Sequence, residues 1–380
     1  MPPVNILVLV HGMVPDDKPR DPLISTEEPQ GFLGKLFDDR KIVIYQKFWE
    51  ELSAKQPELA NLFEKFTQTA SDGKKYTFPF IGVEWLHELP ASPTPSVDAL
   101  YDDQRLTRAQ NFVNERVAHK VLREIDEENN HVMDLFGRDW KMGFDVPTLL
   151  ILRNLVVGLR ETIVTRGLGD VIYYVSADGE ERVRKRVYHQ VLSKLHPYLD
   201  KPDVRLHLWG QSLGVTLTHD FLFGLFNRDP NYTPGFLKLK ATGTETDKID
   251  FETDKIDFEK WRKKAQKGEL RLGSLTSTAS QLPILLMRSQ TVVDTFANQR
   301  LLNATDIGIT DPNRVCWSIF YDVDDLLGFG TRRLYNHDRA IQEFQVDSGD
   351  NPGNAHTNYW KNPVVQKETA QLLYTNALMP

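Results

Sequence analysis

Cysteine is almost absent from this sequence: Cys316 is the only one among 380 residues. A single cysteine excludes an intramolecular disulfide, and this composition suits a reducing compartment such as the cytoplasm. Because the apolar residues Val315 and Trp317 flank Cys316, we expect it to be a small buried residue and not a reactive thiol.

Long apolar runs are also missing. The longest apolar stretch, residues 148–159, is interrupted by Arg153 and Asn154 and is too short to cross a bilayer. The run at residues 6–10 is too short for a signal peptide, and no small-residue cleavage site follows it. The sequence therefore predicts a cytoplasmic protein without a transmembrane segment.

Basic clusters and ligand motifs are scarce as well. The formal net charge is −7, and no basic stripe is available for phosphate groups, which argues against nucleic acid as a partner. The sequence has no His-x-x-x-His, no cysteine pair, no calcium-loop spacing and no glycine-rich nucleotide fingerprint. We therefore expect neither a metal ion nor a cofactor.

What the sequence does contain is a regular alternation of short apolar runs and longer amphipathic segments. The apolar runs are residues 6–10, 80–85, 204–209, 270–275, 315–321 and 344–346. Helical periodicity marks residues 42–66, 106–135, 148–165, 180–195, 215–226 and 291–302. This alternation predicts an α/β fold, with a mostly parallel sheet and helices on both faces. We expect a single domain over residues 1–380.

Two regions interrupt the alternation. Residues 14–41 lack periodicity and are rich in Pro, Asp and Gly, which predicts a long loop. Residues 228–268 are polar and contain a tandem duplication, in which residues 246–252 and 253–259 both read Thr-Asp-Lys-Ile-Asp-Phe-Glu. Two short copies are too few for a solenoid. We interpret this region as a surface insertion, and a mobile cap over a site is the alternative.

Residues 210–214 read Gly-Gln-Ser-Leu-Gly and carry the strongest functional signal. A Gly-x-Ser-x-Gly motif alone is weak, but here an apolar strand precedes it and a helical pattern follows it. Such a turn holds Ser212 in a strained conformation with its hydroxyl above the sheet edge, and its glycines let strand and helix approach closely. The N–H of Leu213 then lies at a helix N-terminus, where it can donate to an oxyanion. The alternative is a glycine-rich turn without chemistry.

With this motif in its context, the sequence resembles the α/β-hydrolase superfamily, and its lipase-like and esterase-like bacterial members above all. In that family a strand ending in His-Gly forms an oxyanion loop, which corresponds here to His11 and Gly12. The resemblance implies an α/β-hydrolase fold and a Ser-His-Asp triad with Ser212 as nucleophile. It also implies that the N–H of Met13 completes the oxyanion hole beside that of Leu213.

The acid of such a triad follows a late strand, and the run at residues 315–321 leads into three aspartates, Asp322, Asp324 and Asp325. Residues 326–329, Leu-Leu-Gly-Phe, follow the last of them in a pattern similar to lipase-like relatives. An acid backed by apolar residues forms a stronger bond to an imidazole. We therefore choose Asp325, and the other two aspartates or a solvated turn remain alternatives.

The histidine is expected in a polar loop after the last strand. Residues 347–355 form such a loop, which ends at His356 ahead of a helix that we expect to begin near Asn362-Pro363 and to run to residue 378. The rival, His337, precedes the last strand. We expect His11 to brace the oxyanion loop and His207, which lies in mid-strand, to be a core histidine.

These residues together predict hydrolysis of a carboxylic ester through an acyl-enzyme. The substrate is expected to be a small-molecule or lipid ester. A lipid or acyl-chain ester is favoured, because the loop from Val14 with Phe32 and Phe37, and the phenylalanines at 221, 223 and 226, can line an apolar cleft. Core packing explains those phenylalanines equally well. A thioesterase or an amidase with the same triad is an alternative, as is a non-catalytic small-ligand-binding protein on a hydrolase scaffold. The oligomeric state is left open.

Overall fold

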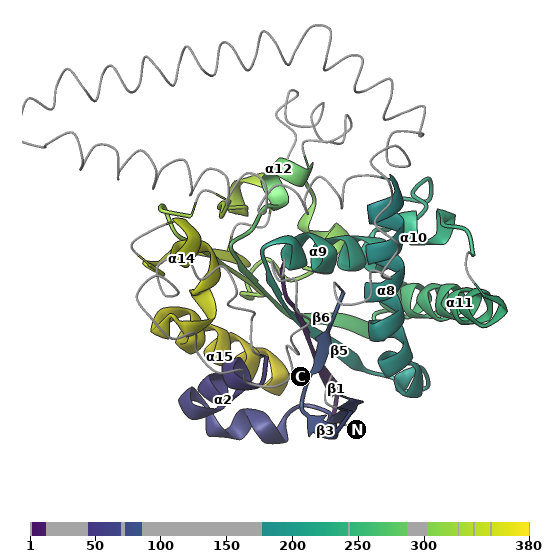
Figure 1. Ribbon diagram of the computed structural model, residues 1–380, viewed down its shortest axis with the longest axis horizontal. Helices are drawn as coiled ribbons and strands as arrows, with labels where there is room; N and C mark the ends of the chain where they lie inside the picture. The colour runs from purple at the N-terminus through teal and green to yellow at the C-terminus, as the bar shows by residue number, and fades with distance from the viewer. Residues whose placement is uncertain are drawn as a thin grey trace, which may run out of the picture. The chain divides into compact units, whose positions relative to one another are not determined.

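Six strands form one sheet in which every neighbouring pair is parallel (Figure 1). The spatial order is β4-β1-β5-β6-β7-β8. The strands are β1 (Val4–Val10), β4 (Ile81–Val83), β5 (Val204–Gln211), β6 (Leu270–Thr278), β7 (Trp317–Tyr321) and β8 (Ile341–Gln345). The six apolar runs of the sequence fall in these strands or overlap them, so the predicted α/β class with a mostly parallel sheet is confirmed.

The structure is a computed structural model that describes residues 2–12, 45–69, 73–85, 177–241, 244–286, 302–325, 327–336, 339–349 and 352–379. All of them belong to one unit made of residues 1–87 and 162–380, and residues 88–161 make up a second unit. The loop expected at 14–41 and the helices expected at 106–135 and 148–165 lie outside the described residues, as does the helix expected at 291–302 apart from its last residue. The expectation of a single domain therefore stays a prediction.

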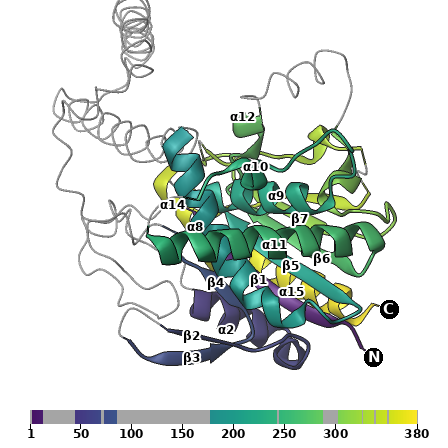
Figure 2. The ribbon, with the colours of Figure 1, turned by 90° about the vertical axis from the view of Figure 1, so that its right-hand side faces the viewer.

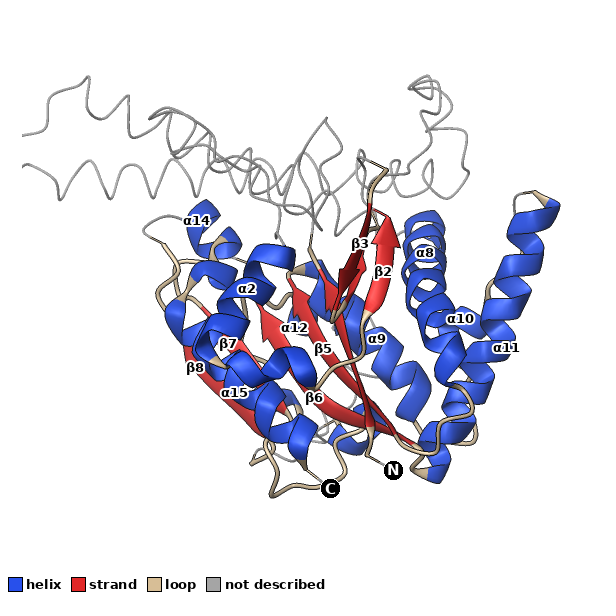
Figure 3. Ribbon diagram, turned by 90° about the horizontal axis from the view of Figure 1, so that it is seen from below, coloured by secondary structure: helices blue, strands red, loops and turns tan. Residues whose placement is uncertain are grey.

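Helices cover the sheet on both faces (Figure 3). One face carries α8 (Ala177–Leu195), α9 (Leu213–Phe226) and α11 (Glu245–Lys267), whereas α2 (Tyr45–Lys55) and α15 (Pro363–Leu378) pack on the other. Helix α15 begins at the residue expected from the sequence, because Asn362 caps it by accepting from the N–H of Val364 at 2.9 Å. In the part of the chain that the structure describes, no helix is long and apolar enough to span a membrane.

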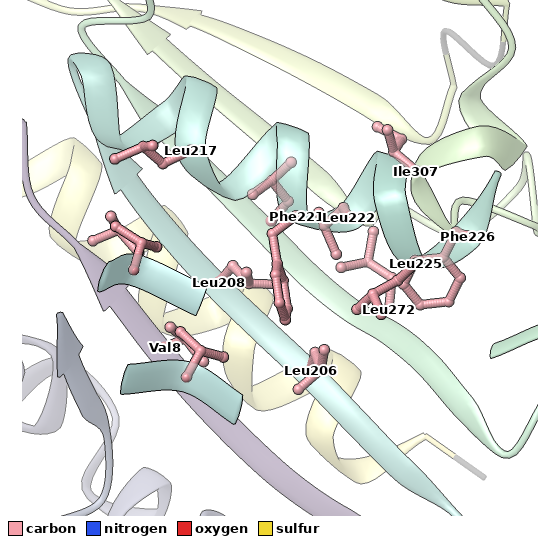
Figure 4. Packing of buried hydrophobic residues seen from close by; sticks show 14 of the residues in the cluster. Val8, Leu206, Leu208, Leu217, Phe221, Leu222, Leu225, Phe226, Leu272 and Ile307 are labelled. Carbon is pink, nitrogen blue, oxygen red and sulfur yellow. The ribbon is translucent and has the colours of Figure 1, made fainter. Parts of the chain in front are cut away.

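The positions of the β1 side chains explain why residues 6–10 of this strand are all apolar. Ile6, Val8 and Val10 belong to the core beneath α8 and α9, whereas Leu7 and Leu9 belong to the core beneath α2 and α15. Because successive side chains of a strand point to opposite faces, a sheet covered twice needs apolar residues at every position. On the first of these faces, α9 lays its apolar side chains over β1, β5 and β6 (Figure 4).

The other elements of the described residues are short (Figure 2). Strands β2 (Phe66–Thr69) and β3 (Lys75–Phe78) pair as an antiparallel two-stranded sheet of their own. The remaining elements are the short helices α10 (Gly235–Lys238), α12 (Leu282–Leu286) and α14 (Pro352–Thr357), with 3₁₀ turns η1 (Pro57–Asn61), η4 (His196–Tyr198), η5 (Ala304–Ile307), η6 (Arg332–Leu334) and η7 (Tyr359–Lys361).

The duplicated segment, which the sequence suggests is a surface insertion, is helical, and its being an insertion stays a prediction. Both copies lie in α11, one continuous helix that packs on α8, α9 and β6 as part of the helical layer. Seven residues are nearly two helical turns, so Phe251 and Phe258 both point inward while Ile249 and Ile256 are both exposed. Each copy therefore contributes one phenylalanine to the core.

Two single-residue expectations are confirmed. Cys316 is fully buried, and burial raises the pKa of its thiol. His207 is a buried core histidine whose ring nitrogens lie 2.8 Å from Ser274 Oγ and 3.2 Å from Asn5 Oδ1. Burial lowers the pKa of His207 to about 3, so its ring is neutral in the folded protein.

Candidate active site

Ser212 occupies the sharp turn between β5 and α9. Its backbone has φ 53° and ψ −125°, and Ala279 is the only other non-glycine residue with positive φ among those described. A serine held in so unfavourable a conformation is typical of a nucleophile on a strand-to-helix turn. The turn also buries Ser212, which is 2% exposed.

Close contacts with neighbouring atoms require glycine at three positions around this turn. A Cβ on Gly210 would lie 2.8 Å from Val215 Cα, and one on Gly214 would lie 2.6 Å from His11 O. A Cβ on Gly12 would lie 2.5 Å from Ser212 Cβ. Contacts this short between non-bonded atoms cannot occur without a shift of the backbone. The glycines of the motif are thus explained by packing around Ser212.

The structure brings Ser212, His356 and Asp325 into one hydrogen-bonded chain. His356 Nε2 lies 2.9 Å from Ser212 Oγ, and His356 Nδ1 lies 2.8 Å from Asp325 Oδ1. An ionised carboxylate only accepts hydrogen bonds, so Nδ1 carries the proton of the neutral ring and Nε2 accepts from the serine hydroxyl. The His356 side chain is 18% exposed and that of Asp325 is fully buried. His356 lies in the short helix α14 and not in the loop that the sequence suggested.

Two further donors fix the Asp325 carboxylate. The Tyr359 hydroxyl donates to Oδ2 at 3.0 Å and the N–H of Leu327 donates to Oδ1 at 2.9 Å. Burial, together with the neighbouring Asp325 carboxylate, raises the pKa of Tyr359 well above its ordinary value. Tyr359 therefore stays protonated and keeps donating. A buried carboxylate with three donors is held in one orientation toward the imidazole.

The other two aspartates do not contact His356. Asp322 accepts from the N–H of Asp324 at 2.9 Å and from the N–H of Ser348 at 2.5 Å, so it holds together the loops that follow β7 and β8. Asp324 is exposed. The rival histidine, His337, lies outside the described residues. Of the three sequence alternatives, only Asp325 is placed to orient the imidazole.

One of the two expected oxyanion donors is described. Leu213 is the first residue of α9, and the N–H groups of a first helical turn have no acceptor within their own helix. The helix dipole favours negative charge there. The other expected donor, Met13, lies outside the described residues, although the preceding Gly12 lies against Ser212.

The residues around His11 hold the loop that precedes Met13. The His11 N–H donates to Tyr45 Oη at 2.7 Å, and the Trp85 indole N–H donates to the His11 carbonyl at 3.0 Å. The Tyr45 hydroxyl in turn donates to the Val83 carbonyl at 2.8 Å. The His11 ring stacks on Trp85 at 5.7 Å. As expected from the sequence, His11 helps to hold this loop in place.

Sequence reasoning missed two glutamines beside Ser212. The Gln281 amide N–H donates to Ser212 Oγ at 3.2 Å, and the Gln211 amide donates to the carbonyls of His356 at 3.4 Å and Thr357 at 3.5 Å. Gln211 lies inside the motif and could have been singled out from it. Nothing in the sequence around Gln281 indicates its place, because the loop after β6 brings it there.

The site can move a proton from a serine hydroxyl to an imidazole whose charged form a buried carboxylate stabilises. Within the described residues, no group of three or more His, Cys, Asp or Glu side chains can hold a metal ion. Comparisons of the chain with protein-family models, with curated proteins and with solved structures give no match. The geometry and the sequence pattern are therefore the basis of any assignment.

Proposed function

We propose that this chain is a serine hydrolase that cleaves a carboxylic ester through an acyl-enzyme. The observation that supports it best is the chain of hydrogen bonds from Ser212 through His356 to Asp325, with Ser212 on a strained strand-to-helix turn. A nucleophile bonded to a base, and a base bonded to an orienting acid, form the arrangement that acyl-transfer enzymes share on unrelated folds.

We also propose that the fold is an α/β-hydrolase fold. Ser212 follows β5, Asp325 follows β7 and His356 follows β8, which is the chain order of nucleophile, acid and histidine in that superfamily. These strands are parallel, so the loops after them meet at the carboxyl edge of the sheet, where open α/β sheets bind their ligands.

In the proposed reaction, Ser212 Oγ attacks the ester carbonyl while its proton moves to His356 Nε2. The N–H of Leu213 donates to the oxyanion that forms, and the N–H of Met13 is proposed as the second donor. The C–O bond to the alcohol then breaks, and His356 returns the proton to the leaving oxygen. Water repeats these steps on the acyl-enzyme and frees the acid and Ser212.

The phenylalanines of α9 bear on the choice between a lipid ester and a smaller ester. Phe221 and Phe226 are buried in the core beneath α9, and Phe223 packs on Tyr232 at 5.0 Å. Packing therefore accounts for these three phenylalanines, which give no support to a lipid ester over a smaller one, and Phe32 and Phe37 lie outside the described residues. A carboxylic ester stays the proposal, with a thioester or an amide as the related possibilities for the same triad.

Turnover of a panel of p-nitrophenyl esters of increasing acyl length tests this proposal. We expect hydrolysis with a burst of p-nitrophenol in the native protein and a loss of at least about 10³-fold in Ser212→Ala. The control is Ser193→Ala, which removes an exposed hydroxyl of α8 and should leave turnover unchanged. A folded protein that cleaves no ester, or a Ser212→Ala variant that cleaves as fast as the native chain, contradicts the proposal and favours a ligand-binding role for this scaffold.

The cytoplasm is the compartment that we propose for this activity. Its support is the single cysteine: Cys316 is buried in the core and has no second cysteine with which to form an intramolecular disulfide. A chain of this length without an intramolecular disulfide is typical of a reducing environment.

A further inference from the structure

The two ends of the Gln281 amide have different surroundings. Ser212 Oγ gives its proton to His356 Nε2, 2.9 Å away, so toward Gln281 it acts as an acceptor. The group that faces it, at 3.2 Å, is therefore the Gln281 N–H. This fixes which way the amide points and leaves its oxygen, Oε1, at the other end of the same planar group.

The amide oxygen of Gln281 is buried without a hydrogen-bond partner among the residues that the structure describes. The whole residue is 2% exposed, so bulk water does not reach this acceptor freely. Buried amide oxygens are usually satisfied, because leaving one unpaired costs about as much as a lost hydrogen bond. An unsatisfied acceptor beside a reactive hydroxyl is a place where a donor on a ligand would be stabilised.

Gln281 lies in a strained loop that backbone hydrogen bonds hold at the site. Ala279, two residues earlier, is buried with φ 53°, and such strain persists where the surrounding structure enforces it. The Thr278 carbonyl accepts from the N–H of Ser212, and the Ser280 carbonyl accepts from the N–H of Phe329, both at 2.9 Å. The loop is thus bonded to the nucleophile and to the loop that carries the acid.

We propose that Gln281 selects the substrate of the proposed hydrolase. Its amide nitrogen holds the Ser212 hydroxyl, and its amide oxygen accepts a hydrogen bond from an O–H or N–H group of the acyl substrate near the scissile carbonyl. The group must lie within a few bonds of that carbonyl, because Oε1 belongs to the same amide as the nitrogen that contacts Ser212. The substrate class is therefore a hydroxyacyl or acylamino ester, and this inference rests on the proposed function.

Substrates without the donor are disfavoured for a physical reason. When a plain acyl chain fills the site, the buried Gln281 oxygen stays without a donor, whereas a hydroxyl or amide N–H of the substrate would satisfy it. A site built to bond a polar group rejects the analogue that lacks it far more strongly than an apolar pocket rejects an extra hydroxyl.

Two pairs of p-nitrophenyl esters of nearly equal shape test this inference. The first pair, 3-hydroxybutanoate and 3-methylbutanoate, exchanges O–H for CH₃. The second pair, N-acetylglycinate and 4-oxopentanoate, exchanges N–H for CH₂. The measured quantity is the ratio of kcat/KM within each pair. Comparing that ratio between the native chain and Gln281→Met cancels the intrinsic reactivity of the esters.

We expect the ratio to favour the donor-bearing ester in the native chain, and to fall by about tenfold in Gln281→Met in at least one pair. The pair in which it falls identifies the donor as hydroxyl or amide. Gln281→Asn keeps an amide but shortens its reach, so it should lower the same ratio even if the methionine variant folds poorly. Ratios that stay unchanged in both pairs overturn the inference.

Gln68→Met is the matched control. Gln68 is a buried glutamine whose amide is bonded at both ends, to the Phe80 carbonyl at 2.8 Å and to the Gly82 N–H at 3.1 Å. Its loss should leave both ratios as they are in the native chain, and a fall equal to that of Gln281→Met overturns the inference. Ser212-dependent turnover with constant ratios refutes the role of Gln281 alone. Absence of turnover of all four esters refutes the proposed function together with it.

Discussion

Removing the hydroxyl of Tyr359 tests how the candidate acid is held. This hydroxyl donates to Asp325 Oδ2 at 3.0 Å and accepts from the N–H of Asp322 at 2.7 Å. The ring packs with Ala279 and Phe320 in a small buried cluster. Tyr359→Phe keeps that packing, so the change isolates the two hydrogen bonds.

The two hydrogen bonds of the Tyr359 hydroxyl set the expected loss of stability. A hydrogen bond to a buried carboxylate contributes about 1.5–3 kcal/mol, and leaving the Asp322 N–H unpaired costs about 1–3 kcal/mol. We therefore expect Tyr359→Phe to lower the free energy of unfolding by about 3–5 kcal/mol, a large part of the stability of a typical domain. Ester turnover should fall much less, by about tenfold, because His356 and Leu327 still bond Asp325 Oδ1.

Equilibrium unfolding in urea measures the first quantity, and the kcat of ester hydrolysis measures the second. Tyr374→Phe is the control, since Tyr374 is only partly buried on α15 and should change stability by no more than about 0.5 kcal/mol. A Tyr359→Phe protein as stable as the native chain would refute the two hydrogen bonds and, with them, this account of how Asp325 is oriented.

Three further predictions follow from the same geometry. Asp325→Asn should lower kcat by about 10⁴-fold, whereas the exposed Asp324→Asn should leave kcat within about twofold of the native value. Equal effects of the two changes in steady-state assays would contradict the assignment of Asp325 as the triad acid. Gly214→Ala places a methyl group against the carbonyl oxygens of Val10 and His11, so calorimetry should show a loss of about 3 kcal/mol; an unshifted melting temperature would contradict the tight turn. Burial lowers the pKa of His207 to about 3, whereas in the unfolded chain this ring takes up a proton near pH 6.5. The free energy of unfolding should therefore fall by about 2 kcal/mol between pH 7 and pH 5 because of this group. Urea unfolding of His207→Gln should show a pH dependence smaller by that amount, and an unchanged dependence would contradict a neutral buried ring.

The strands of the central sheet could be predicted because burial on both faces of the sheet produces short apolar runs in the sequence. Every position of β1 after Val4 is buried, and residues 6–10 form a continuous apolar run. The start of α15 was equally clear, since Asn362 supplies the cap and Pro363 fits the first helical turn. Ser212 could be placed because its glycines are needed for a specific close approach, which few other turns require.

Elements with mixed surroundings were harder to predict. The four residues of β2 alternate between buried and exposed, which is too short a pattern to separate from the helical periodicity around it. Helix α11 is polar because most of its surface faces solvent, and its core contacts come from a few residues such as Phe258 and Trp261. Its polar composition therefore did not indicate the helix that packs on α8, α9 and β6.

The choice of the acid and the place of Gln281 depend on contacts that the sequence does not show. Asp322 and Asp325 are both buried, and only the direction of each carboxylate separates the one that holds two loops together from the one that bonds His356. Gln281 reaches Ser212 through the strained loop at Ala279. Neither arrangement follows from residue type or spacing.

Labelling with a fluorophosphonate probe, followed by mapping of the modified peptide by mass spectrometry, is the most direct test of the proposed nucleophile. The probe reacts with a serine only where a neighbouring base activates it. We predict one adduct per chain, on Ser212, that disappears in Ser212→Ala and forms far more slowly in His356→Gln. A folded native chain that takes up no probe, or an adduct on another serine, would contradict the catalytic role of Ser212.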